Sequence, residues 1–468
     1  MHAAGYGRTT SIRRSIADPF RNIRSNIVIK DVSRRKRKKM KKQMLEFLKT
    51  VLIFSFGKFK KFTLRFKKTK TMKDMMIVYY SEAKSARLTG KKVAWITSGG
   101  PVEPLLAMGI IPVYPENYGA MIGASKMGGG LCEKAEAMGY SSDLCSYARA
   151  DIACATINGG PLQGMPKPDM LVCCNNICGT VLKWYEVQAR YFNVPLFILD
   201  TPFCHTEYTQ EAAKYVRSQI DEYIVFLEDV CKRKFDYDRL NEILLRSFQT
   251  QVLWQEILDT TTNKPSPMTA FDAFFHMALI VTLRGTPEVV DYFTALLATM
   301  KDRVARGIGA VPNEKYRLLW DNIPIWHRMK WLSQKFASHN ACLVADTYTS
   351  AWCGTLKYVS GDNPIDSLAE VYTRIYLNIG VDEMAKMIIA MIDKYDVDGL
   401  VLHSNRSCKP YSFGQLDIQR IVEQERGIPC LMIEADMADE RSFSESQIST
   451  RIDAFMEIIK ERKETSKK

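Results

Sequence analysis

Three cysteines of this 468-residue chain stand where a loop gives way to a helix, a position in which thiolates bind metals. They are Cys145, Cys178 and Cys408, each followed by a run that reads as a helix. Backbone N–H groups at a helix start favour a thiolate, and such helices begin at the carboxyl edge of a parallel sheet. Three thiolates from distant parts of one chain therefore predict an iron–sulfur cluster with one unusual coordination position. On these residues alone, three unrelated buried thiols are an equal alternative, because the chain has no C-x-x-C pair.

Two further polar residues follow expected strands. Ser98 lies in the turn after the apolar run 92–96, and Glu116 lies just past the run 111–114. Parallel neighbouring strands would bring both loops to one sheet edge. A carboxylate in a dry cleft could then serve as an acid or a base. Without further information, a turn serine and a solvated loop glutamate is the simpler interpretation.

The elements that must position these residues alternate between strand and helix at both ends of the chain. Short apolar runs separated by helical periodicity are typical of parallel, doubly wound sheets. We therefore expect an α/β fold with two doubly wound parallel-sheet domains joined by a helical segment, after a basic N-terminal extension. The expected parts are a basic, disordered leader (1–74), an N-terminal α/β domain (75–206), a helical connector (207–340) and a C-terminal α/β domain (341–468).

The chain has a net charge of +13, and its whole basic excess lies in the leader. Residues 1–74 contain 23 Lys and Arg against 4 Asp and Glu, a charge of +19, which leaves −6 for the rest. The leader could be an arm for nucleic acid or anionic lipid, a solvated tail, or sequence upstream of a true start near Met72, Met75 or Met76. The last two are favoured, because nothing after residue 75 resembles a nucleic-acid binder. We expect no nucleic-acid partner.

Membrane and secretory roles are also not expected. The apolar run 45–56 is short and flanked by charge, and no signal-peptide cleavage site is visible. Twelve cysteines in a chain of this length do not make a disulfide scaffold. These features predict a cytoplasmic protein in a reducing environment.

Five segments resemble the 2-hydroxyacyl-CoA dehydratase and benzoyl-CoA reductase family. Together they cover roughly residues 90–460, in the family's order. They are P-x-E-x-x-x-A-x-G-x-x-P (101–112), C-S-Y-A-R (145–149), a cysteine eight residues before the glutamate of K-W-Y-E (178 and 183–186), S-N-R-S-C-K-P-Y-S (404–412) and G-I-P-x-L-x-I-E-x-D (427–436).

This resemblance implies a 4Fe-4S cluster held by Cys145, Cys178 and Cys408, with the fourth iron site open. It also implies catalytic roles for Ser98 and Glu116 in substrate placement and proton transfer. The expected activity is that of an oxygen-sensitive (R)-2-hydroxyacyl-CoA dehydratase, a hydro-lyase that eliminates water through a ketyl radical. The implied partners are an acyl-CoA substrate, a second homologous large subunit in a heterodimer or homodimer, and a separate ATP-hydrolysing iron–sulfur activator.

Three alternatives stay open at this point. The chain could be a benzoyl-CoA reductase subunit, which is an oxidoreductase, a double-cubane-cluster reductase, or an electron-relay subunit without a substrate site. Cys174 is a possible extra ligand, although a strand cysteine is more often core. Arg149, Arg406 and Lys409 could neutralise thiolates or contact coenzyme A phosphates. His403 is interpreted as a hydrogen-bonded core residue, and the acyl group is not revealed.

Overall fold

The computed structural model describes residues 71–206, 208–355 and 363–465, which belong to one compact unit. Residues 1–70 of the expected leader lie outside the described residues, so its role stays a prediction. Residues 72–74, assigned above to the leader, instead form the first turn of helix α3 (Met72–Ser85). Thr71 caps this helix in a reciprocal pair with Asp74.

The first sheet has four parallel strands in the order β2-β1-β3-β4. Their apolar residues are buried on both faces in β1, β2 and β3, as expected for a sheet covered by helices on each side. The strands are β1 (Val93–Ile96), β2 (Ile111–Val113), β3 (Met170–Cys174) and β4 (Leu196–Leu199). The helices of this lobe are α3, η1 (Ala86–Thr89), α4 (Glu103–Ala107), α5 (Pro115–Ala124), α6 (Gly128–Ala137), α7 (Ser146–Ile157), η2 (Pro161–Gln163) and α8 (Thr180–Phe192).

The second sheet repeats this topology, with four parallel strands in the order β6-β5-β7-β8. The predicted α/β class with two parallel sheets is therefore confirmed. The strands are β5 (Tyr316–Asp321), β6 (Ala341–Asp346), β7 (Gly399–Asn405) and β8 (Cys430–Ala435). The helices of this lobe are η4 (Trp326–Arg328), α14 (Met329–Ser338), α15 (Thr347–Ser350), α16 (Pro364–Thr373), η6 (Tyr376–Asn378), α17 (Val381–Tyr395), α18 (Lys409–Ser412), α19 (Gln415–Arg426), η7 (Glu440–Ser442) and α20 (Glu445–Thr465).

Strand β5 corrects the sequence analysis, which placed its residues in a helical connector. β5 pairs with both β6 and β7 and so lies inside the second sheet. The second α/β lobe therefore begins before residue 341. The strand was not recognised because it contains Arg317, and a charged residue in a short apolar run usually indicates an exposed segment. In the structure Arg317 is buried, and its guanidinium donates hydrogen bonds to three backbone carbonyls and to Glu314.

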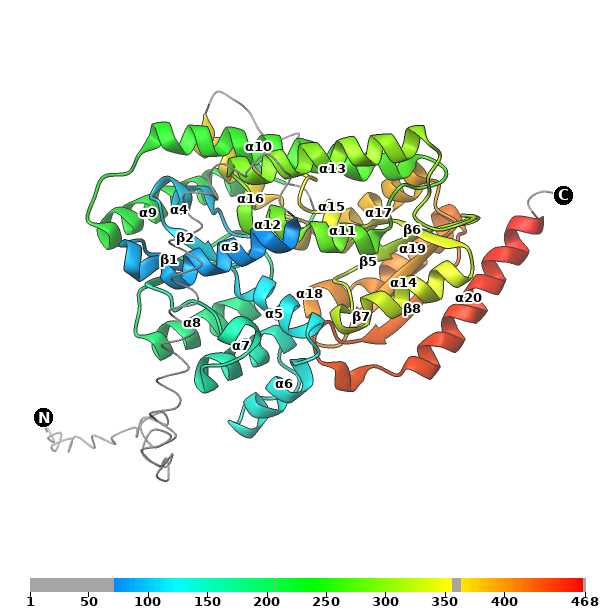
Figure 1. Cartoon of the computed structure of the whole chain (residues 1–468), viewed down its shortest axis with the longest axis horizontal. Coiled ribbons are helices and arrows are strands. Elements are labelled where there is room, and N and C mark those ends of the chain that lie inside the picture. The colour runs from blue at the N-terminus through cyan, green and yellow to red at the C-terminus, as the bar shows by residue number, and fades with distance from the viewer. Residues whose placement is uncertain (1–70, 207, 356–362, 466–468) are drawn as a thin grey trace, which may run out of the picture. The chain divides into compact units, whose positions relative to one another are not determined.

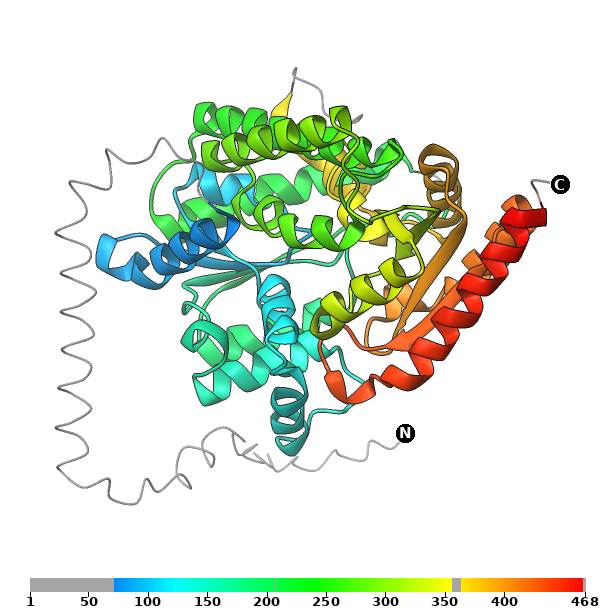
Figure 2. The ribbon, with the colours of Figure 1, turned by 45° about the vertical axis from the view of Figure 1, so that its right-hand side comes forward.

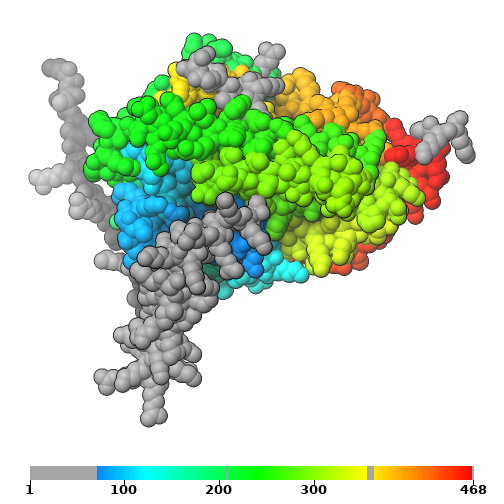
Figure 3. All heavy atoms as spheres, turned by 45° about the horizontal axis from the view of Figure 1, so that its top comes forward, coloured from blue at the N-terminus to red at the C-terminus, as the bar shows by residue number. Residues whose placement is uncertain are grey.

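The long helices that lie between the two sheets in chain order pack against both lobes. α10 contacts α4 of the first lobe and lies beside α13, with which it forms a continuous helical surface (Figures 1 and 3). On the far side of the second sheet, α20 packs along β8 (Figure 2). The helices of this segment are α9 (Gln210–Cys231), α10 (Tyr237–Asp259), η3 (Thr260–Thr262), α11 (Ala270–His276), α12 (Ala278–Leu283) and α13 (Pro287–Ala305).

One hydrophobic core joins the lobes. It contains Trp95 and Leu171 of the first sheet together with Leu319 and Leu400 of the second, all fully or nearly fully buried. The carboxyl edges of both sheets are thereby held in a fixed relation, which is what a site between them requires. No helix in the described ranges is long and apolar enough to cross a membrane.

Candidate active site

A single cavity of about 180 Å³ is lined by all five predicted site residues. Ser98, Glu116, Cys145 and Cys178 come from the first lobe, and Cys408 comes from the second. This volume is roughly ten times the space that one buried water needs, so the cavity is of ligand size. It lies where the strand order of each parallel sheet reverses, at the carboxyl ends of β1 and β3 and of β7. Ligands bind at such switch points in open parallel sheets.

Each of the three cysteines lies at the start of a helix. Cys145 is the N-cap residue of α7, Cys408 is that of α18, and Cys178 comes one residue before the N-cap of α8. In each case the backbone N–H three residues further along lowers the pKa of the thiol. The predicted helix-start placement is therefore present at all three positions.

Burial nevertheless raises the pKa of each of these thiols. The pKa of Cys145 rises to about 12, and that of Cys408 rises well above its usual value, because burial and the neighbouring cysteines disfavour a negative charge. The pKa of Cys178 is also raised by burial. Without a cation, the three sulfurs are neutral thiols. A bound metal reverses this preference, since a coordinating thiol loses its proton.

The donor set fits a cluster better than a single ion. Within the described ranges, no three His, Cys, Asp or Glu side chains are placed to hold one metal ion. In an iron–sulfur cluster each cysteine binds a different iron atom, so its ligands stand farther apart than the ligands of one ion. Three thiols that line one cavity and influence one another electrostatically, yet do not converge on a point, match that requirement.

Glu116 lies in the first turn of α5 and faces Ser98 across the ends of β1 and β2. Its Oε1 accepts a hydrogen bond from the Ser98 N–H at 3.3 Å, and its Oε2 accepts one from the Tyr185 hydroxyl at 3.3 Å. Burial raises the pKa of Glu116 to about 7, and these hydrogen bonds only partly offset the effect. The carboxyl group is therefore poised to exchange a proton near neutral pH.

Tyr185 was not predicted as a site residue, although it belongs to the quoted K-W-Y-E segment. The glutamate of that segment, Glu186, instead lies at the surface and pairs with Lys183 and Arg190. The quoted segment was the right one, but the sequence analysis singled out its glutamate and not the neighbouring tyrosine that contacts Glu116.

The remaining candidates are structural or lie away from the cavity. Cys174 is fully buried in β3, where its sulfur contacts the Thr201 hydroxyl at 3.6 Å, and it does not line the cavity. His403 is a core residue, as expected, with Nδ1 2.5 Å from the Ile323 carbonyl oxygen. Burial lowers its pKa to about 4.

The three basic residues near the cysteines have partners within the protein. Arg149 is buried and paired with Glu136 and Asp439. Arg406 is exposed and pairs with Glu434, and Lys409 donates to the Arg406 carbonyl. Arg149 is therefore not free to contact a phosphate.

Most of the cavity wall is apolar or aromatic. Glu116 and Arg284 are the only charged side chains among its described lining residues. Arg284 is buried and lies 3.6 Å from Glu103, and it also donates to the Gly100 carbonyl and the Tyr372 hydroxyl. Its charge and its donors are thus engaged by the protein. The aromatic and aliphatic lining includes Trp184, Tyr348, Trp352, Val371, Ile375 and Tyr376.

The chain is similar in sequence to a known protein family and to several of its characterised members. Residues 97–459 match the family model described as 2-hydroxyglutaryl-CoA dehydratase, D-component. The chain is 35% identical over 397 residues to the (R)-2-hydroxyisocaproyl-CoA dehydratase alpha subunit of Clostridioides difficile, which covers 84% of this chain and 96% of the relative. It is also 35% identical over 385 residues to the (R)-phenyllactyl-CoA dehydratase alpha subunit of Clostridium sporogenes, covering 82% and 93%.

A more distant similarity extends to the second branch of the expected family. A benzoyl-CoA reductase subunit of Thauera aromatica is 28% identical to this chain over 414 residues, covering 84% of this chain and 94% of the relative. The resemblance inferred from the five sequence segments is confirmed. The chain belongs to the 2-hydroxyacyl-CoA dehydratase and benzoyl-CoA reductase family, and it is a subunit of an enzyme of that family.

Proposed function

We propose that this chain is the iron–sulfur subunit of an (R)-2-hydroxyacyl-CoA dehydratase and that it carries the substrate site. The observation that supports this proposal is the single cavity in which three helix-start cysteines and the Ser98–Glu116 pair lie together. An electron-relay subunit would need the cysteines alone. A half-buried acid–base group beside them is the feature that a substrate site requires.

Cys145, Cys178 and Cys408 would hold a 4Fe-4S cluster. When bound, this group would pass on the electron received from an activator and would provide an iron atom that polarises a substrate oxygen. The chain's own contribution is to bring the three thiols together from two lobes and to surround them with an apolar wall that excludes water. Exclusion of water protects a reactive radical from side reactions.

Glu116 would move the proton in this reaction. Its carboxyl group lies in the cavity with a pKa of about 7, so it can donate or accept a proton at neutral pH. The Ser98 N–H and the Tyr185 hydroxyl fix both oxygens of that carboxyl group. The Ser98 side chain, which also lines the cavity, would orient the substrate's polar groups.

The acyl chain that fits this cavity is uncharged and hydrophobic. A substrate with a second carboxylate would need a free cation in the wall, and among the described lining residues the one cation, Arg284, is already engaged by Glu103. An unpaired carboxylate in such surroundings costs several kcal/mol. We therefore assign the preferred substrates to the aliphatic or aromatic 2-hydroxyacyl-CoA thioesters, by chemical class.

The proposed enzyme needs two partners. Two of the relatives are named alpha subunits, which supports a second large subunit. A separate ATP-hydrolysing activator would supply the electron. Benzoyl-CoA reduction is the second candidate, because a reductase subunit is 28% identical and the cavity wall is rich in aromatic rings.

The test is anaerobic purification of the chain with its partner subunit and activator, followed by assay with a panel of acyl-CoA substrates. The proposal predicts water elimination from 2-hydroxyacyl-CoA with catalytic, not stoichiometric, use of ATP and reductant. Stoichiometric consumption of electrons with benzoyl-CoA would select the reductase alternative. An active complex whose turnover is unaffected by changes at both Ser98 and Glu116 would move the substrate site to the partner.

A further inference from the structure

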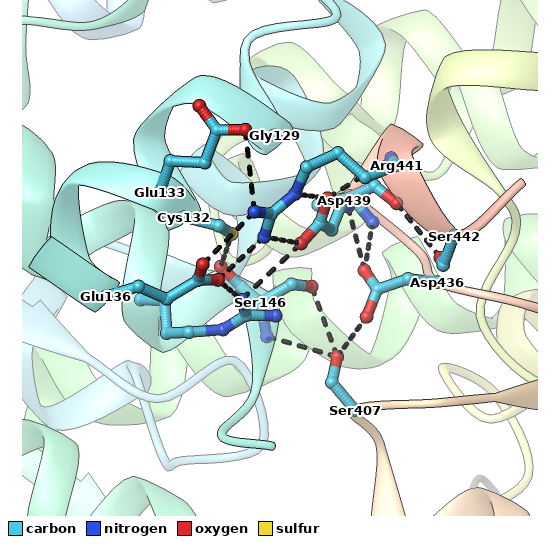
Figure 4. Close-up of polar contacts among 12 residues, drawn as sticks. Gly129, Cys132, Glu133, Glu136, Ser146, Ser407, Asp436, Asp439, Arg441 and Ser442 are labelled. Carbon is cyan, nitrogen blue, oxygen red and sulfur yellow. Dashed lines mark hydrogen bonds and ion pairs between the residues drawn. The ribbon is translucent and has the colours of Figure 1, made fainter. Parts of the chain in front are cut away.

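The residues beside Cys145 and Cys408 form a hydrogen-bonded chain that crosses between the lobes (Figure 4). The Ser146 N–H donates to the Ser407 hydroxyl oxygen at 3.1 Å. The Ser407 hydroxyl in turn donates to Oδ2 of Asp436 at 2.5 Å. Ser146 directly follows Cys145 and Ser407 directly precedes Cys408, so this contact joins the two cysteine loops one residue away from each thiol.

The contact among Ser146, Ser407 and Asp436 is buried, and both carboxylate oxygens of Asp436 accept hydrogen bonds. Ser146, Ser407 and Asp436 are 0%, 7% and 2% exposed. The other oxygen of Asp436 accepts the N–H groups of Ala438 and Asp439, both at 2.8 Å. The carboxylate is therefore fixed by the loop that follows β8. A hydrogen bond to a carboxylate acceptor is stronger than one between neutral groups.

A second set of contacts holds the same two segments together. Arg441 makes paired hydrogen bonds to Glu136 of α6 and to Asp439 (Figure 4). Arg149 of α7 also contacts both carboxylates. The backbone N–H of Gly129 donates to Glu440 at 2.8 Å. These ion pairs join the helix that follows Cys145 to the loop that carries Asp436.

The glycine run 128–130 allows the start of α6 to lie very close to the loop that follows β8. A Cβ atom at Gly128 would lie 1.9 Å from the Ala438 carbonyl oxygen, so only glycine allows the start of α6 to reach the loop after β8. This run is not a nucleotide-binding fingerprint. Its placement against the second lobe indicates a packing role in the same interface.

We propose that Ser146, Ser407 and Asp436 form a positioning clamp that sets the separation of the Cys145 and Cys408 sulfurs. This inference rests on the proposed cluster, because it assigns the clamp a role toward that group. Cys408 is the one candidate ligand from the second lobe, so its distance from Cys145 depends on how the lobes pack. The clamp fixes that distance at the point nearest to both thiols. Partners that orient metal ligands typically change metal affinity by about 10- to 100-fold when removed.

The test compares Ser407→Ala with Ser412→Ala in the anaerobic complex. Ser412 also follows β7, but its hydroxyl donates to the Asn405 carbonyl within the same lobe. Two quantities are measured for each variant. One is the rate at which iron is released to a chelator, and the other is hydrogen exchange of the backbone segment 144–149, which contains the Ser146 N–H. Asp436→Asn and the double variant with Ser407→Ala complete a mutant cycle.

We expect Ser407→Ala to release iron about 10 to 100 times faster and to exchange faster in the segment 144–149. Ser412→Ala should match the unaltered complex in both measurements. The double variant should release iron at the rate of Ser407→Ala, since Asp436→Asn disrupts only the Ser407–Asp436 hydrogen bond, which Ser407→Ala has already removed. Unchanged exchange in Ser407→Ala, or additive effects in the cycle, would overturn the clamp.

Two further results are decisive in different ways. Faster exchange with unchanged iron release would overturn the role toward the cluster, because the contact would then join the lobes without positioning the thiols. Absence of iron from the unaltered complex would contradict the proposed function, and the positioning role would fall with it. Exchange would then still report separately whether the serine contact joins the two lobes.

Discussion

Replacing Glu116 with glutamine should slow the enzyme while stabilising its iron-free fold. The substitution preserves the shape of the side chain and removes its ionisable proton. The amide oxygen can still accept the Ser98 N–H, and the amide nitrogen can donate to the Tyr185 oxygen, so both contacts survive in a modified form. The protein should therefore fold and keep its cluster.

The effect on turnover follows from the loss of proton transfer. General acid–base catalysis contributes about 10²- to 10⁴-fold, which corresponds to roughly 3–5 kcal/mol of activation free energy. The variant should still accept an electron from the activator, because Glu116 is not a candidate ligand. A large loss of turnover with normal iron content would place the residue in the chemistry and not in assembly.

The effect on stability has the opposite sign. Burial raises the pKa of Glu116 from 4.5 to about 7, so the folded state disfavours the carboxylate. This penalty is absent below about pH 4.5, grows as the pH rises toward 7, and is complete above that value. The full shift corresponds to about 3 kcal/mol. Because the side chain is partly exposed to the cavity, we expect a gain of about 1–3 kcal/mol for Glu116→Gln at pH 8.

The assay measures turnover in the reconstituted complex and denaturant unfolding of the iron-free chain from pH 5 to pH 8. The matched control is Glu186→Gln, which removes a surface carboxylate that pairs with Lys183 and Arg190. The control should retain turnover and gain no stability as the pH rises. If Glu116→Gln turned over at the unaltered rate, or lost stability at pH 8, the assignment of a buried proton-transfer group would be refuted.

Four other outcomes are expected. Single alanine variants of the three candidate ligand cysteines should lose iron and the visible absorption of the cluster, whereas Cys231→Ala, outside the cavity lining, should retain both. Ser98→Ala should keep its iron but lower turnover, as measured beside Glu116→Gln. A chain beginning at Met72 should fold and assemble normally, at a cost of about 1 kcal/mol for the lost helix cap, as followed by unfolding and cluster content. Hydrophobic 2-hydroxyacyl-CoA substrates should exceed a dicarboxylic one in kcat/KM by at least about a hundredfold, and equal values would contradict the assignment of the acyl chain.

The sequence predicted a strand correctly wherever the burial of its apolar residues alone determines where the strand lies. The runs at β3 and β7 are short and apolar because both faces of a parallel strand are covered, and their pattern survives without tertiary information. β5 was not predicted, because its buried Arg317 donates hydrogen bonds to the carbonyl groups of residues 261, 263 and 395. Such long-range pairing has no local sequence signature.

Part of the candidate site could also be predicted from the sequence, whereas the roles of two of its residues could not. Cysteines at loop-to-helix transitions can be found from local patterns, and the order of parallel strands brings such transitions to one edge. Tyr185 and Asp436 were part of the quoted segments, but their roles depend on which side chain faces the cavity or the other lobe. That orientation is set by packing between elements far apart in the chain.

The repeated topology explains why Cys145, unlike Cys178 and Cys408, depends on the clamp for its position. β3 and β7 occupy the same place in the two sheets, and Cys178 and Cys408 follow them by four and three residues. Cys145 has no such counterpart, because it comes from the connection between β2 and β3. In the matching connection of the second lobe, Cys353 is buried in the core and does not line the cavity. Two thiols are thus placed by the strand order itself, while the third depends on α6 and α7 being held against the second lobe. The contacts around Ser146 and Arg149 supply that restraint, so loosening them should affect iron retention before it affects the fold.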